Sequence, residues 1–491
     1  YIAILYTGSR SGFLGLLAGG FVFFLFSKQK ILLLKFVFLP LLILSLLIGT
    51  PIDSQLKQLT ERFLPSSTPN SQLSTLNSEP TGPALETGGT ESGKIRLIVW
   101  KGAITAFLHN PIFGTGVETF AFAYYKYRPV EHNLTSEWDY LYNKAHNEYL
   151  NYLTTTGIFG LGSYLFMIGT FLFVTLRNHS PRGEAGKSQI IFALLAGYVS
   201  ILVSNFLGFS VVIINIYLFL IPSFVFVLEG MTREKNYSLP TIRYPLLAIL
   251  PIILATLYLL FTLYRFWEAD KSYARGYNLN RAGQYQYGYF DLGDAVEKRP
   301  SEPVFLDELS YNAGVLAVAL ASQTDEDTSE SAKIASYAAR LTDETIKVSN
   351  KVVSDHPNNI TFFKTRIRLL NLLSQDDPKY LSLALDAAKK ASVLAPTDAK
   401  ISYSLGILYG QNGEKQKALE ALKKAIELKP DYRDAYFAIS LFYHDMATDK
   451  NSRVIDAALQ QKAIETMQYI LDHIASNDAQ AQKALDTWVK L

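Results

Sequence analysis

The sequence has no cysteine in its 491 residues. This absence excludes a disulfide framework, a thiolate zinc site and a cysteine nucleophile. An excess of charge of either sign is also missing, because 46 Lys and Arg residues nearly balance 44 Asp and Glu residues. A nucleic-acid-binding protein usually has a concentrated basic face, so this balance argues against nucleic acid as a partner.

The chain also lacks an initiating methionine and begins at Tyr1, beside an apolar run. A secretory signal peptide has a positively charged segment before its apolar core and a cleavage site after it. Neither feature is found here, so we predict no signal peptide. We expect that the N-terminal part of a longer protein is missing; the alternative is a genuine N-terminus after processing.

Long apolar runs dominate the sequence up to Tyr264, whereas charged, helix-forming sequence follows from Arg265. A membrane span needs about 20 mostly apolar residues to cross ~30 Å of hydrocarbon. The runs that qualify are Ser11–Phe26, Ile31–Gly49, Glu148–Leu176, Gln189–Phe209, Val211–Leu228 and Tyr244–Tyr264. We therefore predict an all-α protein, with a polytopic membrane bundle over residues 1–264 and a soluble helical domain over 265–491.

Positive charges in short loops predict the orientation of the bundle, because such loops lie on the cytoplasmic side. Three loops fall on one side if the spans alternate in direction. They contain Lys28, Lys30, Arg177, Arg182, Lys187, Arg233, Lys235 and Arg243. We expect a multi-pass protein of the cytoplasmic (inner) membrane, with loop 50–147 and residues 265–491 extracytoplasmic.

The extracytoplasmic loop has two parts. Residues 51–92 are rich in Ser, Thr, Pro and Gly, a composition typical of a flexible stretch. Residues 93–110 have apolar side chains at helical spacing, and Pro111 ends this predicted helix. Gly114 and Gly116 then indicate a turn and are only a weak match to a phosphate-binding loop.

Three ionisable residues stand out on this side of the predicted membrane: Arg10, Arg96 and His146. Two guanidinium groups can bind a diphosphate, because their planar donors match phosphate oxygens. A histidine can accept a proton from a hydroxyl near neutral pH. No Asp, Glu or His cluster has the spacing of a dedicated metal site, so we expect metal-independent chemistry without a cofactor.

Each of these residues also has a purely structural interpretation. Arg10 is then an interfacial anchor whose charge reaches the lipid headgroups. Arg96 pairs with Glu91 on a helix surface, and His146 is an ordinary residue at the entrance of a helix. From the residues alone, the loop indicates a polar site and little more.

The order of the motifs supports a more specific hypothesis. They are Ser9-Arg10-Ser11-Gly12, Arg96-x-x-x-Trp100, Asn110-Pro111-x-x-Gly114-x-Gly116-x-x-x-Phe120, Ala145-His146-Asn147-x-Tyr149-Leu150 and Gly157-Ile158-x-Gly160. This string resembles the core of the O-antigen ligase and O-antigen polymerase superfamily, which includes bacterial O-oligosaccharyltransferases. The resemblance covers roughly residues 1–230.

The resemblance implies an inverting, metal-independent membrane glycosyltransferase that uses an undecaprenyl-diphosphate-linked glycan as donor. It assigns the donor diphosphate to Arg10 and Arg96, and activation of the acceptor hydroxyl to His146. Asn147 and Glu148 are expected to support the histidine without touching substrate. Ligase, polymerase and protein oligosaccharyltransferase share this donor, so the acceptor and the glycan structure stay open.

The tail contains a helical repeat that is clearest over residues 398–431. Pro396 and Pro430, which end successive units, are 34 residues apart, the period of a tetratricopeptide repeat. Stacked repeats form a concave surface that usually binds a protein or peptide. We therefore expect a protein partner or a protein acceptor. The alternative to catalysis is a membrane-anchored tetratricopeptide scaffold for protein–protein interaction.

Overall fold

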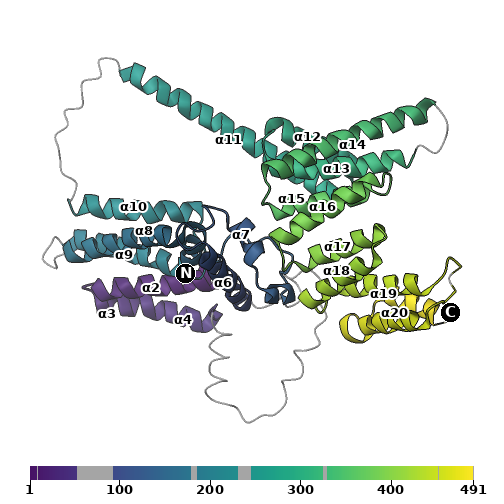
Figure 1. The fold of residues 1–491 in the computed structure, drawn as a ribbon. Helices are drawn as coiled ribbons and strands as arrows, with labels where there is room; N and C mark the ends of the chain where they lie inside the picture. Colours follow the sequence, from purple (N-terminus) through teal and green to yellow (C-terminus); the bar gives the residue numbers. More distant parts are fainter. Residues whose placement is uncertain are drawn as a thin grey trace, which may run out of the picture. The chain divides into compact units, whose positions relative to one another are not determined.

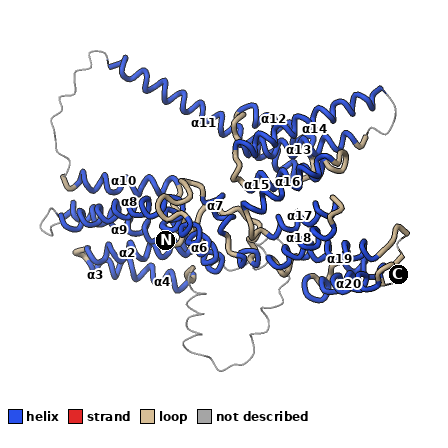
Figure 2. The backbone as a smooth tube through the Cα atoms, in the orientation of Figure 1, coloured by secondary structure: helices blue, strands red, loops and turns tan. Residues whose placement is uncertain are grey.

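The computed structural model describes residues 1–7, 9–51, 92–178, 185–230, 245–323, 329–451 and 453–489. Within these ranges the regular structure is helical, apart from one isolated bridge between Thr448 and Val454 (Figure 2). The predicted all-α fold class is confirmed. Two compact units, Tyr1–Asn236 and Tyr237–Leu491, divide the chain and are described separately. The predicted division at Tyr264, which follows hydropathy, stays a prediction.

Several predicted features lie outside the described residues. They are most of the flexible stretch 51–92, Glu91, and the loop charges Arg182, Arg233, Lys235 and Arg243.

The first unit consists mainly of helices (Figure 1). Its elements are α1 (Ile2–Tyr6), α2 (Arg10–Phe26), α3 (Lys30–Leu33) with a π-helical turn (Leu34–Phe38), α4 (Leu39–Ile48), α6 (Ser92–His109), α7 (Phe120–Tyr127), a 3-10 turn (Val130–Leu134), α8 (Glu148–Asn178), α9 (Ala185–Phe206) and α10 (Val212–Leu228). Ser9 caps α2, because its side chain accepts a hydrogen bond of 3.2 Å from the Gly12 amide.

Small residues bring α2 and α9 into close contact. A Cβ atom added to Gly15 or Gly19 would lie 2.8 Å from a backbone carbonyl oxygen of α9. The Ser204 hydroxyl donates a 3.2 Å hydrogen bond to the Ser11 carbonyl across the same interface. Without water between helices, such close approach and interhelical hydrogen bonds hold membrane helices together. The core of the unit lies among α8, α9 and α10, around Tyr198.

Length and apolar composition identify five candidate spans among the described residues. They are Lys30–Ile48, Glu148–Arg177, Gln189–Phe206, Ile249–Arg281 and Pro303–Ala321, and the shorter apolar helices are Arg10–Phe26 and Val212–Leu228. The fifth candidate was not predicted from the sequence. It coincides with α13 (Pro303–Ala321), which packs against its neighbouring repeat helices and contains the buried Asp307 and Asn312. We therefore assign α13 to the repeats.

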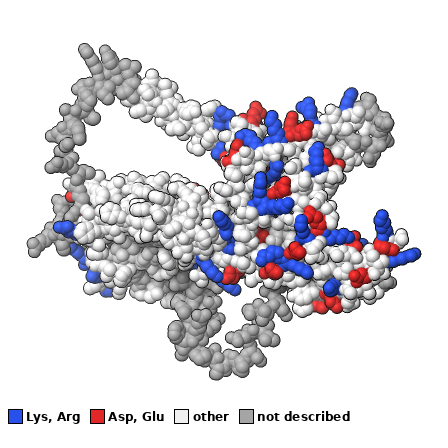
Figure 3. Space-filling view, viewed as in Figure 1, with Lys and Arg blue, Asp and Glu red and all other residues white. Residues whose placement is uncertain are grey.

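The second unit is a series of paired helices whose surface carries most of the charged side chains seen in Figure 3. After α11 (Pro245–Arg281) come α12 (Tyr285–Lys298), α13, α14 (Ser329–Asp355), α15 (Ile360–Leu373), α16 (Lys379–Leu394), α17 (Ala399–Gln411), α18 (Lys415–Leu428), α19 (Arg433–Ala447), α20 (Ala457–Tyr469) and α21 (Ala479–Trp488). Each helix contacts the next in sequence, as expected for stacked repeats.

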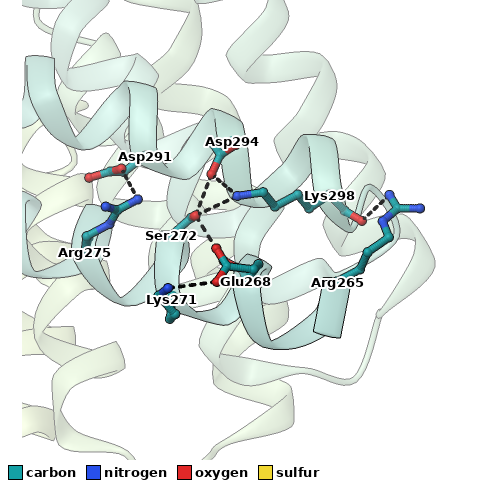
Figure 4. A network of polar contacts seen from close by, with 8 residues as sticks. All are labelled: Arg265, Glu268, Lys271, Ser272, Arg275, Asp291, Asp294 and Lys298. Carbon is teal, nitrogen blue, oxygen red and sulfur yellow. Dashed lines mark hydrogen bonds and ion pairs between the residues drawn. The ribbon is translucent and has the colours of Figure 1, made fainter. Parts of the chain in front are cut away.

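Helix α11 changes character along its length. Its N-terminal part is the predicted sixth span, and its exposed side chains there are mostly apolar. A polar network begins at Arg265, which donates a 3.0 Å hydrogen bond to the Lys298 carbonyl (Figure 4). Arg275 pairs with Asp291 at 3.1 Å, and Ser272 donates to Asp294 at 2.5 Å. These contacts fasten the charged part of α11 to α12.

Candidate functional site

Arg96 is held in place by the buried face of α6. Ile95, Val99 and Ala103 pack against side chains of α7 and of the segment before α8. The apolar spacing in the sequence predicted this helix correctly. Arg96 follows the buried Ile95 directly, so its own side chain is half-buried beside the core.

Arg10 and Arg96 lie close enough to interact, although they are far apart in sequence. Burial lowers the pKa of Arg96, and the positive charge of Arg10 lowers it further. The negative charge of Glu137 acts in the opposite direction. Two like charges in one place make a site that favours a polyanion, because each anionic oxygen relieves their repulsion.

His146 lies near Arg96 and has a strained backbone. Its φ angle is +52°, in the left-handed region that residues other than glycine seldom adopt. Its ring packs edge-on against Tyr142 at 5.7 Å and Phe209 at 5.1 Å between centroids. Burial lowers the pKa of His146, and Arg96 lowers it further, whereas Glu137 raises it. The imidazole is therefore favoured in its neutral form, which can accept a proton.

Asn147 and Glu148 fix the segment that carries the histidine. The Asn147 side chain accepts a 3.0 Å hydrogen bond from the Leu150 amide and so caps α8. The Glu148 carboxylate accepts a 3.1 Å hydrogen bond from the Ser210 amide, between α9 and α10. Both side chains are buried and bonded to backbone. This geometry suits the supporting role predicted for them.

Two residues of the site have no motif that singles them out in the sequence. Tyr142 donates a hydrogen bond to the Glu137 carboxylate, and its ring contacts both His146 and, at 5.1 Å, His132. Burial and Glu137 together raise the pKa of Tyr142, so its hydroxyl stays protonated as a donor. Glu137 is thus an acidic group oriented beside Arg96 and His146.

His132 has a structural role instead. It is fully buried, and the Tyr124 hydroxyl lies 2.9 Å from Nδ1 while the Glu137 carbonyl lies 3.3 Å from Nε2. Both ring nitrogens are therefore engaged. The buried Arg128 reinforces the same stretch by donating to the Trp138 carbonyl at 3.0 Å. The site consequently has one half-buried histidine, His146, and one structural histidine.

Helix α8 is broken at Gly157, where φ is 68° and ψ is −165°. The sequence predicted one continuous span from Glu148, within which Gly157 was singled out only as part of a motif. In the structure, the loop after α6 pairs with the broken turn. The Thr115 amide donates to the Thr154 carbonyl at 3.0 Å, and the Ile158 amide donates to the Pro111 carbonyl at 2.9 Å. These bonds satisfy backbone groups that the break releases, as irregular backbone at membrane depth requires.

Among the residues that the structure describes, no group of three or more His, Cys, Asp or Glu side chains is placed to hold a metal ion. The guanidinium groups of Arg10 and Arg96, which interact electrostatically, suit an anionic ligand instead.

Apolar helices of membrane-spanning length, followed by stacked helix pairs, define an integral membrane protein with a tetratricopeptide-like solenoid. Residues 1–165 match the family model described as O-antigen ligase, and residues 399–432 match the tetratricopeptide repeat model. The N-terminal part of the chain therefore contains an O-antigen ligase domain, and its C-terminal part contains a tetratricopeptide repeat. The resemblance predicted from the ordered motifs is confirmed. This family supports a membrane glycan-ligase type of function, and the repeats support protein interaction.

Individual relatives cover smaller parts of the chain. The photosystem I assembly protein Ycf3 of Rippkaea orientalis is 30% identical over 124 residues, which are 24% of this chain and 69% of that protein. The protein MJ0572 of Methanocaldococcus jannaschii is 51% identical over 39 residues, which are 8% of this chain and 45% of that protein. The solved tetratricopeptide protein TTC0263 of Thermus thermophilus is 17% identical, with a TM-score of 0.33, over 45% of this chain and 100% of its own.

Proposed function

We propose that this protein transfers a glycan from an undecaprenyl-diphosphate-linked donor to an acceptor hydroxyl at the extracytoplasmic face of the cytoplasmic membrane. The observation that carries the proposal is the electrostatic contact of Arg10 with Arg96 and of Arg96 with His146. These residues come from α2, α6 and the segment before α8, which are distant in sequence. Their convergence is what a diphosphate leaving group and an acceptor hydroxyl need.

The reaction follows from the chemistry of the three side chains. Arg10 and Arg96 bind the donor diphosphate and stabilise the charge that it gains as it leaves. Neutral His146 accepts the proton of the acceptor hydroxyl. The acceptor oxygen then forms a bond to the anomeric carbon, while the bond from that carbon to the diphosphate oxygen breaks. The products are the glycosylated acceptor, the prenyl diphosphate and a protonated His146.

Removing the charge of Arg96 tests this proposal. The full-length protein, reconstituted in vesicles with a synthetic prenyl-diphosphate-linked glycan, should form a glycosylated acceptor detectable by mass spectrometry. A hydrogen bond to a charged group contributes about 1.5–3 kcal/mol, so we expect Arg96→Ala to slow transfer by roughly 10- to 150-fold. The matched control is Lys101→Ala in the same helix, because Lys101 is exposed and pairs with Glu131 at 2.6 Å. Wild-type transfer by Arg96→Ala would remove the support for this site.

Glu137 gives a prediction about pH. Its charge raises the pKa of His146, so Glu137→Gln should lower that pKa. Transfer requires neutral His146, and its rate therefore rises as pH increases through the pKa of the histidine. The acidic limb of the pH–rate profile should move to lower pH in Glu137→Gln. Tyr142→Phe is the control, because it removes the hydrogen bond to Glu137 and keeps the carboxylate charge. An unmoved limb would contradict this coupling.

The alternative function is a membrane-anchored tetratricopeptide scaffold without catalysis. The repeats support a protein partner or a protein acceptor, and such binding is compatible with transfer. A scaffold alone does not require two guanidinium groups beside a half-buried histidine. The reconstituted transfer assay separates the two functions, because a scaffold forms no glycosylated product with any acceptor.

A further inference from the structure

An exposed apolar stripe follows α8 beyond its break. Ile158, Phe159, Phe166 and Phe173 are 59%, 66%, 76% and 60% exposed, respectively. The three phenylalanines are seven residues apart, so they lie on one face of the helix. About 20 residues separate Gly157 from Leu176, which at ~1.5 Å per residue matches the ~30 Å hydrocarbon thickness of a bilayer. The stripe therefore faces lipid, and Gly157 lies near one edge of the hydrocarbon.

The loop that pairs with the broken helix continues this stripe. Ile112, Phe113 and Val117 are 52%, 76% and 75% exposed, and the ring of Phe113 stacks on that of Phe159 with centroids 5.8 Å apart. Backbone hydrogen bonds from Thr115, Gly116 and Ile158 hold the loop against α8. The three apolar side chains are thus presented by a fixed loop.

Charge is absent from residues 111–117 and resumes at Glu118. The Glu118 carboxylate pairs with Lys144 at 2.5 Å, on the segment that leads to His146. The loop consequently has an apolar tip beside the span and an ion pair directly after it. This sequence of apolar and charged groups resembles the gradient from hydrocarbon to headgroups at a membrane surface.

We propose that residues 111–117 form a lipid-binding loop, which inserts Ile112, Phe113 and Val117 into the bilayer beside the end of α8. The occupant of this surface is bilayer lipid, because the exposed side chains are continuous with the lipid-facing stripe of a membrane span. The loop fastens the C-terminal end of α6, the helix that carries Arg96, to the membrane surface. This role is independent of the transfer chemistry.

Site-directed nitroxide labelling tests the loop without interference, because the chain has no cysteine. Phe113→Cys and Val117→Cys are labelled in the full-length protein in phosphatidylcholine–phosphatidylglycerol vesicles. Collision rates with oxygen, which partitions into lipid, and with a water-soluble nickel chelate are then compared. Phe166→Cys is the lipid-facing reference. Tyr140→Cys, at a 57% exposed position in the segment before α8, is the aqueous reference.

We expect both loop labels to lose collisions with the nickel chelate to the level of Phe166→Cys. Chelate accessibility equal to that of Tyr140→Cys would overturn the proposal, because the loop would then lie in water. Low accessibility to both reagents would overturn it as well, because another helix or a partner protein would then cover the loop. Quenching of Val117→Trp by brominated lipids, measured against unmodified protein, provides a second readout if the label at Phe113 perturbs folding.

Discussion

Replacing His146 with asparagine should lower the rate of glycan transfer by about 100- to 10,000-fold near neutral pH, the usual contribution of general acid–base catalysis. Asparagine tolerates the left-handed backbone that His146 adopts at φ +52°. It has no group that can accept a proton near neutral pH. The substitution therefore removes the proposed base while keeping the local fold, which His146→Ala does less reliably because alanine disfavours that backbone conformation.

The same reconstituted transfer assay measures this effect. His109→Ala is the matched control, since His109 is exposed at the end of α6, where its ring lies 4.8 Å from that of Tyr127. Its transfer rate should equal that of the wild type. Because burial and Arg96 lower the pKa of His146, the acidic limb of the wild-type profile should lie below the ordinary histidine pKa of ~6.5. Full activity in His146→Asn would exclude a catalytic base at this position.

Much of the architecture could be predicted from the sequence because its signals are local. A membrane span needs only consecutive apolar residues, and a tetratricopeptide repeat needs only a period, such as that between Pro396 and Pro430. Helix α6 could be predicted equally well, since its buried residues Ile95 and Val99 follow helical spacing. Arg10, Arg96 and His146 were identified by the order of their motifs. Their catalytic roles stay predictions, although Arg10 interacts electrostatically with Arg96 and Arg96 with His146.

The rest depends on contacts between distant segments. Tyr142 and Glu137 have ordinary sequence neighbours, and they matter only because the chain folds them against His146 and Arg96. The break in α8 was missed for a related reason. Gly157 lies in an otherwise continuous apolar run, and its conformation is set by hydrogen bonds to the loop around Pro111. The spacing of apolar residues within α8 cannot indicate a hydrogen-bond partner that lies more than 40 residues away in the sequence.

Gly157→Ala should therefore be among the most destabilising single substitutions in the membrane unit. With φ 68° and ψ −165°, Gly157 occupies a backbone region that is essentially restricted to glycine. An added Cβ would lie 2.2 Å from the Ile112 carbonyl oxygen and 2.7 Å from the Gly114 amide nitrogen. Backbone atoms cannot move aside as a flexible side chain can, so we expect a loss of on the order of 3 kcal/mol or more.

Thermal unfolding of the purified protein in detergent, followed by the loss of monodisperse material, measures this change. Gly162→Ala is the control, because Gly162 lies in the same helix and its added Cβ would meet no atom within 4 Å. Gly162→Ala should be neutral or slightly stabilising, since alanine favours the helix by up to ~1 kcal/mol. Equal stability of the two variants would show that α8 can straighten without cost. We expect instead that the break is needed to hold the loop at Pro111 against α8. Because α8 begins directly after His146, Gly157→Ala should then lose glycan transfer as well as stability.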